Sequence, residues 1–311
     1  MSRRVRTAVA AIAVALGCAG CGFGPGLAAK GVDVRVTEAF GTQKLGDAHD
    51  SKVTGTVMQA LQRSFKVSTA YSGGFVESID GHAGSASDQH DWFYYVNGIQ
   101  AAKGAASTQL HKGDHVWWDL HDWKATDSIP AVVGSFPEPF TNGVGGQRYP
   151  TIVECANGES APCRTVTKEL ESFKVPAPQG GIGYGSGNDS IGVVVGSWKQ
   201  IDGELAAELV KYGPGASGVY ARFVDGGSKL ELLGVDGNVV KTLGPGTGLV
   251  AAVNGNGAGN SNAVPTWLIT GTDAAGVAAA AKALTPSRLA DRFALAVQGS
   301  TDYPAPYQVS P

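Results

Sequence analysis

The residues of this chain that could hold a ligand are concentrated in two aromatic runs, DWFYYVNG and HVWWDLHDW. Side chains of a strand alternate between its two faces, so Trp92, Tyr94 and Val96 of the first run share one face. Phe93 and Tyr95 share the other face. One set must fill a hydrophobic core. A row of large rings left outside is costly unless a ligand or another part of the protein covers it.

We predict that the outer aromatic surface stacks against a flat or ring-shaped small molecule, while a few polar groups fix its orientation. The predicted ligand-binding residues are Trp92, Tyr94, Tyr95, Asn97, Trp117, Trp118, Asp119, His121 and Trp123. The alternative use of the same rings is contact with a second domain, which would leave no concave pocket beside them.

The histidines are unevenly distributed, since all six lie in the first 121 residues: His49, His82, His90, His111, His115 and His121. Those at the two ends of HVWWDLH fall on one face of a strand together with Asp119. They would stand about 20 Å apart on an ideal strand, so one metal ion cannot bridge them. Their spacing also matches no known zinc signature. We therefore predict no metal site.

We find no known catalytic motif in the sequence. The chain has no G-x-S-x-G serine elbow, no phosphate-loop lysine and no dinucleotide-binding glycine fingerprint. Its second half contains no histidine that could act as a base beside a serine. We predict a protein that is not an enzyme and has no cofactor. The remaining alternative, a hydrolase, would need a nucleophile, a base and an orienting group together in a cleft between two domains.

The first residues predict export. Three arginines precede an apolar run of about ten residues, which is too short to span a bilayer of roughly 30 Å as a helix. The small residues before Cys21 resemble the bacterial lipoprotein box, so residues 1–20 are a predicted signal peptide and Cys21 the predicted lipidated residue. Residues 21–31 would form a tether. Cys18 is a second candidate anchor, and plain secretion with ordinary cleavage is an alternative.

The charge of the mature chain disfavours nucleic acid as a partner. Removal of the signal peptide changes the formal charge from −3 to −6, with 21 basic and 27 acidic residues remaining. Binding to nucleic acid needs clustered Lys and Arg, and no basic stripe is visible.

Two cysteines remain beyond the signal peptide, Cys155 and Cys163, and the loop between them contains an Asn-Gly turn. In an oxidising compartment such a pair is expected to form a disulfide. No histidine lies nearby to complete a metal site.

The aromatic runs must be positioned by the elements around them. VDVRVTEA alternates valine with polar residues as a half-buried strand does, and TVMQALQRSF has helical spacing with Thr54 or Thr56 as its cap. Short strands follow between glycine-containing turns, and Asn97-Gly98 is the signature of a type I′ hairpin turn. The order of strand, helix and further strands is that of a β-grasp fold.

Residues 32–126 resemble the transcobalamin C-terminal-like family in GGFVESIDG, WFYYVNGI and the GD before HVWWD. That family is an extracellular relative of the soluble-ligand-binding β-grasp domains. The resemblance implies small-molecule binding, with a cobalamin-like ligand as one candidate. Cobalamin carriers also use an α-helical barrel, which this sequence lacks, and no residue matches a known cobalt-ligand position. The whole chain resembles an uncharacterised group of actinobacterial lipoproteins.

The second half of the chain predicts a different architecture. Residues 127–148 form a Pro-rich connector, expected to be extended against a surface. Over residues 149–300, a strand, a turn and a helix recur at least twice, which predicts an α/β domain with an open mixed sheet. Residues 301–311 would be a C-terminal tail, and the loop over 255–262 a mobile lip. The predicted fold class of the whole chain is α+β.

These features together predict a lipid-anchored protein on the extracellular face of the cell membrane that binds a small molecule. A role as the capture component of a nutrient importer follows from the resemblance alone. The alternative is a non-catalytic module for protein-protein contact at the cell envelope, with an importer or envelope protein as its partner.

Overall fold

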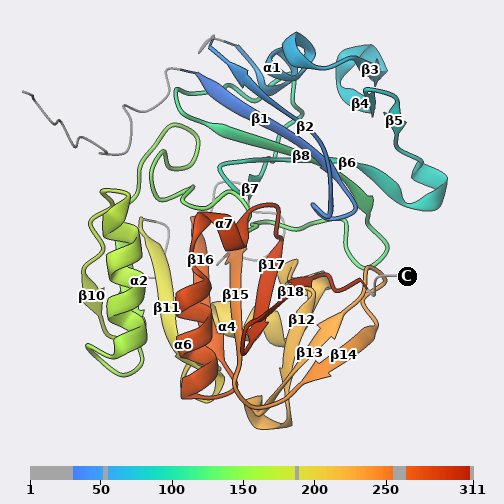
Figure 1. Cartoon of the computed structure of the whole chain (residues 1–311). Coiled ribbons are helices and arrows are strands. Elements are labelled where there is room, and N and C mark those ends of the chain that lie inside the picture. The colour runs from blue at the N-terminus through green and yellow to red at the C-terminus, as the bar shows by residue number, and fades with distance from the viewer. Residues whose placement is uncertain (1–30, 52–54, 186–188, 255–263, 309–311) are drawn as a thin grey trace, which may run out of the picture.

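The computed structural model describes residues 31–51, 55–185, 189–254 and 264–308. Cys18, Cys21, the predicted signal peptide and the predicted loop 255–262 lie outside the described residues. The chain has an α+β fold in which two β-sheets stand one above the other, with the connector between them (Figure 1). No helix among the described residues is long and apolar enough to cross a membrane.

A five-stranded mixed sheet forms the N-terminal half, in the order β2-β1-β8-β6-β7. The two central strands β1 and β8 are parallel, whereas the other neighbours are antiparallel. This is the arrangement expected of a β-grasp-like unit. The strands are β1 (Val32–Glu38), β2 (Gln43–Asp50), β6 (His90–Val96), β7 (Ile99–Gln100) and β8 (His115–Asp122).

One face of this sheet is covered by helix α1 (Val57–Ser64). Thr56 is its N-cap, because Gln59 N donates to Thr56 Oγ1 at 3.3 Å while Thr56 N donates to Gln59 Oε1 at 3.1 Å. The helix buries one apolar stripe, including Leu61, against the valines of β1. A small antiparallel sheet flanks it, made of β3 (Val67–Ala70), β4 (Phe75–Ile79) and β5 (His82–Ala83).

The hairpin turn predicted at Asn97-Gly98 is confirmed. Both residues have positive φ, 53° and 77°, as a type I′ turn requires, and the turn joins β6 to β7.

A seven-stranded sheet forms the C-terminal half, in the order β10-β9-β11-β16-β15-β17-β18. The first four strands are parallel and the last three antiparallel, so the sheet is open and mixed as predicted. Its strands are β9 (Thr151–Cys155), β10 (Gln179–Gly180), β11 (Ile191–Ser197), β15 (Thr247–Asn254), β16 (Pro265–Gly271), β17 (Ala294–Gln298) and β18 (Thr301–Ala305).

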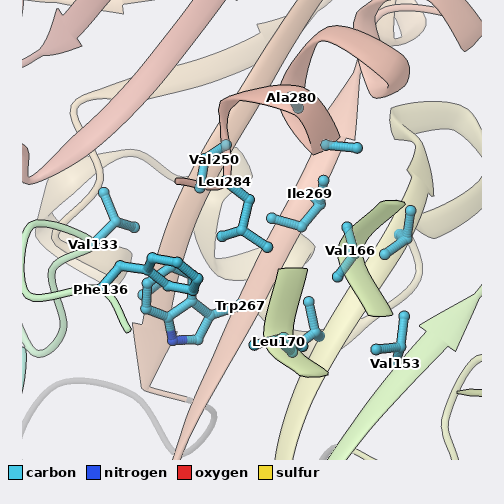
Figure 2. Packing of buried hydrophobic residues seen from close by; sticks show 14 of the residues in the cluster. Val133, Phe136, Val153, Val166, Leu170, Val250, Trp267, Ile269, Ala280 and Leu284 are labelled. Carbon is cyan, nitrogen blue, oxygen red and sulfur yellow. The ribbon is translucent and has the colours of Figure 1, made fainter. Parts of the chain in front are cut away.

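Helices cover both faces of this sheet. On one face α2 (Ala161–Ser172) and α6 (Ala274–Ala283) lie side by side. Figure 2 shows Leu170 of α2 and Ala280 of α6 in the apolar core that these helices form with Trp267 of the sheet. The short helices α3 (Trp198–Ile201) and α4 (Leu205–Lys211) cover the opposite face. Three antiparallel strands extend that layer: β12 (Ala221–Val224), β13 (Lys229–Leu233) and β14 (Val239–Leu243).

The remaining helices are short. They are α5 (Pro214–Ser217) and α7 (Pro286–Leu289). Helix α4 begins at Leu205 with Glu204 as its N-cap.

The connector is compact rather than extended, so the prediction of an extended segment is wrong. Its residues form consecutive turns and bury Val133, Phe136 and Phe140. The rings of Phe136 and Phe140 lie 5.9 Å and 5.0 Å from the ring of Trp267 on β16. Figure 2 shows Phe136 beside Trp267. Each such side chain stabilises the fold by about 1.5–3 kcal/mol when buried. That gain favours a folded connector over an extended one.

The predicted disulfide is formed between Cys155, the last residue of β9, and Cys163 in the first turn of α2, with their Cα atoms 6.1 Å apart. It therefore fixes the end of a strand to the start of the helix that follows.

Candidate ligand-binding site

The antiparallel strands β6 and β8 carry the two aromatic runs, and we call this strand pair the aromatic hairpin. Its two faces are divided as the alternation predicts. Trp92 and Trp118 are buried beneath α1, and Tyr94 stacks on Trp118 with ring centroids 4.8 Å apart. These three rings therefore serve the core of the N-terminal half. Only the edge of Tyr94 reaches the surface, where its hydroxyl donates to the carbonyl of Lys103 and lies 2.8 Å from Thr108 Oγ1.

The opposite face is covered by the C-terminal half of the same chain. Tyr95 and Trp117 are fully buried, and both rings pack against Phe293, at centroid distances of 5.7 Å and 5.1 Å. Phe40 and His121 also contact Phe293, at 5.1 Å and 5.3 Å. The rings proposed to form an open aromatic surface on this face are therefore closed to a ligand by the second domain. This outcome corresponds to the alternative use of the rings, contact between domains.

Two of the predicted polar orienters complete that interface. The buried Asp119 carboxylate accepts from the backbone N–H groups of Phe40 at 3.0 Å and Gly41 at 2.8 Å, and lies 2.8 Å from His121 Nδ1. The His121 ring sits between Phe40 and Phe93, each 4.5 Å away. A buried carboxylate needs such partners to offset the loss of water. Asp119 therefore fixes the turn that carries Phe40, whose ring contacts Phe293, and His121 contacts Phe293 directly.

Gly41 shows how closely the two halves approach. Its φ is +76°, and a Cβ atom there would lie 2.1 Å from the Asp291 carbonyl oxygen. Nearby, Asp291 Oδ1 pairs with Arg35 Nη1 of β1 at 2.6 Å. Trp123, the last of the predicted rings, is half-buried and donates from Nε1 to Asp91 Oδ2 at 3.1 Å.

A buried polar network lies at the far end of the hairpin, around Asn97 and Asp114. Asn97 Nδ2 donates to Asp114 Oδ1 and to the Gly143 carbonyl, each at 2.9 Å, while Asn97 Oδ1 accepts from His115 N at 2.9 Å. The other oxygen of Asp114 accepts from His111 N at 2.7 Å. Asn97 is thus fully used within the protein, although the sequence suggested that it contacts a ligand.

The same network anchors the connector. Asn142 Nδ2 donates to the Gly113 carbonyl at 2.8 Å, and the Glu138 carboxylate accepts from Asn142 N at 2.8 Å. Burial, followed by the nearby charge of Asp114, raises the pKa of Glu138, although its hydrogen bonds oppose this effect. Gly113, at φ +86°, leaves no room for a side chain, because a Cβ atom would lie 2.8 Å from Asn142 Oδ1.

These contacts shape a hollow of about 260 Å³, which we call the hairpin hollow. Its walls are the β6–β7 hairpin, the loop that follows it, and the connector turn. Its surface is mainly apolar, although seven of its thirteen lining residues carry polar side chains. The lining residues are Val96, Ile99, Gln100, Ala101, Ala102, Lys103, Ser107, Thr108, Gln109, His111, Asp114, Val144 and Gly145.

The hairpin hollow was not found from the sequence, because none of the nine predicted ligand-binding residues lines it. Tyr94 touches its rim through Lys103 and Thr108. The signal that was available is the pair of turns at Asn97-Gly98 and Gly113-Asp114. The buried bonds that join these two turns to the connector depend on the tertiary structure.

A second, polar hollow of about 330 Å³ lies against β1 and β2, where Arg35, His49 and His115 face it. His115 Nδ1 is 3.1 Å from Ser135 Oγ, which pairs a base with a hydroxyl at the boundary of the two halves. Burial, and next the charge of Arg35, lower the pKa of His115 to about 4. Within the described residues no third group bonds to this ring, and no three His, Cys, Asp or Glu are grouped to hold a metal ion.

Comparison with known proteins finds a family match for one part of the chain. Residues 55–122 match the family model described as "Domain of unknown function (DUF4430)". A solved structure described as a "putative metal binding protein" from Ruminococcus gnavus is 19% identical over 30% of this chain and 96% of that chain, with a TM-score of 0.26. No curated protein matches the chain. A likeness at this TM-score says nothing about function.

Proposed function

We propose that the protein is an exported, lipid-anchored binding protein that holds a small molecule in the hairpin hollow and performs no chemistry on it. The observation that supports this is the hollow itself, a concavity whose surface is mainly apolar and whose lining also supplies polar side chains, a combination typical of small-molecule sites. Its rim is fixed by buried hydrogen bonds of Asn97 and Asp114, so it is largely preformed.

The resemblance to the transcobalamin C-terminal-like family supports binding rather than catalysis. The matched residues 55–122 include two of the three walls of the hollow. A volume of about 260 Å³ lies just below the roughly 300–1,000 Å³ of sites that enclose a whole drug-sized ligand. We therefore propose a small ligand, or one end of a larger molecule such as a corrinoid.

The test is a titration of the full-length protein with cyanocobalamin, riboflavin and maltotriose, followed by tryptophan fluorescence. Trp118 can report on the hollow because it stacks on Tyr94, whose hydroxyl bonds to the rim at Lys103 and Thr108. Free tryptophan amide in parallel corrects for light absorbed by the added compounds.

Two variants locate the binding. Ala102→Phe places a ring in the hollow, whereas Ala106→Phe makes the same change at an exposed position of the same loop that does not line it. We expect at least one compound to quench, with its affinity reduced at least about tenfold by Ala102→Phe and unchanged by Ala106→Phe. The proposal fails if no compound quenches, or if both variants bind as the unaltered protein does.

The proposed lipid anchor has its own test. Growth with radiolabelled palmitate should label the unaltered protein, and Cys21→Ser should abolish the label and release the protein from the membrane fraction. Cys18→Ser is the matched control and should keep the label. Loss of label in Cys18→Ser alone would move the anchor to Cys18, and no label in any variant would favour plain secretion.

A second candidate function, contact with an envelope protein, is favoured by two exposed rings on the small N-terminal sheet. Tyr71 is 88% exposed and Phe75 is 40% exposed, and both lie at the β3–β4 hairpin. Crosslinking in intact cells through a photoreactive residue at position 71 would test it. A discrete crosslinked band supports this function, and a monomer-only pattern speaks against it.

A further inference from the structure

A second concave site lies in the C-terminal half, at the carboxyl ends of its parallel strands. It is a hollow of about 380 Å³, which we call the sheet-end hollow. The segments after β9 and β11 and the first two turns of α6 line it. The side chains used below are Asn157, Ser160, Ser197, Gln200, Ala274 and Ala278.

The sheet-end hollow is distinct from the hairpin hollow. It lies at the end of the seven-stranded sheet that faces away from the connector. Trp267, near the start of β16, contacts Phe136 and Phe140 of the connector. The strand then runs away from the connector to its last residue, Gly271. Parallel strands end at the same edge of a sheet, so the ends of β9 and β11 lie on this remote side as well.

The topology of the sheet makes this edge a crevice. Strands β9 and β11 are parallel neighbours. The helix that follows β9, α2, packs on the face that carries α6, whereas the helices that follow β11, α3 and α4, pack on the opposite face (Figure 1). The chain thus leaves the two strand ends in opposite directions. In open α/β sheets, ligands bind in the crevice at such a switch point.

The walls of the crevice are rigid. The disulfide Cys155–Cys163 ties the end of β9 to the start of α2. The Asp273 carboxylate accepts from Gly276 N at 2.8 Å and from Gly246 N at 2.7 Å, which holds the start of α6. Because the helix start is bonded by its own cap, recognition of a ligand falls to the side chains that line the hollow.

The polar side chains that line the sheet-end hollow are uncharged, which favours a neutral ligand. In the described part of the chain, the lining contains amides and hydroxyls from Asn157, Ser160, Ser197 and Gln200 but no charged side chain. Amides and hydroxyls both donate and accept hydrogen bonds, as the hydroxyl groups of a sugar do. A phosphate or carboxylate would find no cation here and would meet the charge of Asp273 beside the lining.

One bond within the lining shows which groups remain for a ligand. Ser197 Oγ donates to Gln200 Oε1 at 2.7 Å, and the same oxygen accepts from Ser197 N at 3.0 Å. Among the described residues nothing accepts from the Gln200 amide nitrogen, so its two N–H groups can donate to a bound hydroxyl. The apolar part of the lining, which includes Ala274 and Ala278, suits the C–H face of a pyranose ring.

We propose that the sheet-end hollow binds a neutral sugar, a hexose or an N-acetylhexosamine. The test is saturation-transfer NMR on the full-length protein with glucose and N-acetylglucosamine as probes, and with glucose 6-phosphate as the charged comparison. We expect transfer to at least one neutral sugar and weaker transfer to the phosphate.

Two variants on α6 test whether the saturation transfer arises from sugar bound in the sheet-end hollow. Ala278→Trp fills the hollow and should abolish the transfer, while Ala275→Trp makes the same change at an exposed position of α6 outside the lining and should preserve it. Circular dichroism verifies that both variants are folded. Asn157→Ala, in a loop, should weaken binding about fivefold through the loss of one hydrogen bond.

Three results would overturn the proposal. They are the absence of transfer to both neutral sugars, transfer that survives Ala278→Trp, and binding of glucose 6-phosphate at least as strong as that of glucose.

Discussion

Replacement of Phe293 by alanine tests whether the aromatic hairpin is used to join the two halves. The Phe293 side chain is 4% exposed and follows α7 in the C-terminal half. Its ring lies between 5.1 Å and 5.7 Å from the rings of Phe40, Tyr95, Trp117 and His121, all from the N-terminal half. It is therefore the main point at which the C-terminal half covers the aromatic face.

The expected loss follows from the cavity that the substitution creates. Removal of a buried phenylalanine ring costs about 3–5 kcal/mol when the surroundings relax only partly. For a chain of this size, that loss lowers Tm by roughly 1.5–2 °C for each kcal/mol. Phe293→Ala should also expose Trp117, because its indole loses the ring packed against it.

The assay is urea unfolding of the full-length protein, followed by tryptophan fluorescence, with acrylamide quenching of the folded state as a second measurement. Phe75→Ala is the matched control, since Phe75 is 40% exposed and away from the interface, and it should change the free energy of unfolding by about 0.5 kcal/mol or less. A loss below about 1 kcal/mol for Phe293→Ala, with unchanged quenching, would refute the inference that this ring holds the halves together.

Three further substitutions test the polar contacts and the disulfide. The pKa of His115 is lowered to about 4, so the unfolded chain, with a His pKa of about 6.5, binds more protons between these values. Stability should therefore fall by up to about 3 kcal/mol as the pH drops from about 6.5 to 4, and unfolding curves of His115→Gln should lack that part of the pH dependence. Cys163→Ser should reduce the free energy of unfolding in urea by about 2–3 kcal/mol, because the unfolded chain gains freedom when the loop closed with Cys155 is opened. An unchanged midpoint would mean that the bond does not constrain the unfolded chain. Asn97→Ala should cost about 2–4 kcal/mol, since it leaves the buried Asp114 Oδ1 without its donor and places alanine at φ 53°, and a loss under 1 kcal/mol in thermal unfolding would contradict this.

Much of the fold could be predicted from local patterns. The capped helix after Thr56, the turn at Asn97-Gly98 and the buried strand IGVVVGS each carry a signal within a few residues, and each is found where that signal lies. The connector was predicted wrongly because its prolines suggest an extended chain. The burial of Phe136 and Phe140, which favours compact turns, depends on a strand more than 100 residues later.

The site was less predictable than the fold, for a related reason. Strand alternation correctly divides the rings of the aromatic hairpin into two faces, but it cannot show which face the rest of the chain will cover. Trp117 and Asp119 are the residue types that a ligand site uses, but Trp117 packs against Phe293 in the domain interface and Asp119 fixes the turn at Phe40. About half of the residues that line the hairpin hollow are small or aliphatic, such as Ala102 and Val144, and these carry no functional signal until the chain folds.

The most direct test of the central claim, that the hairpin hollow is the binding site, is amide hydrogen exchange of the full-length protein. Exchange is compared with and without whichever of cyanocobalamin, riboflavin and maltotriose quenches most strongly. We predict slower exchange confined to the segment 99–111, which carries most of the lining residues of the hollow, and to the connector turn at Val144 and Gly145. Protection that appears only over residues 115–123 and around Phe293, or no protection at all, would contradict the claim.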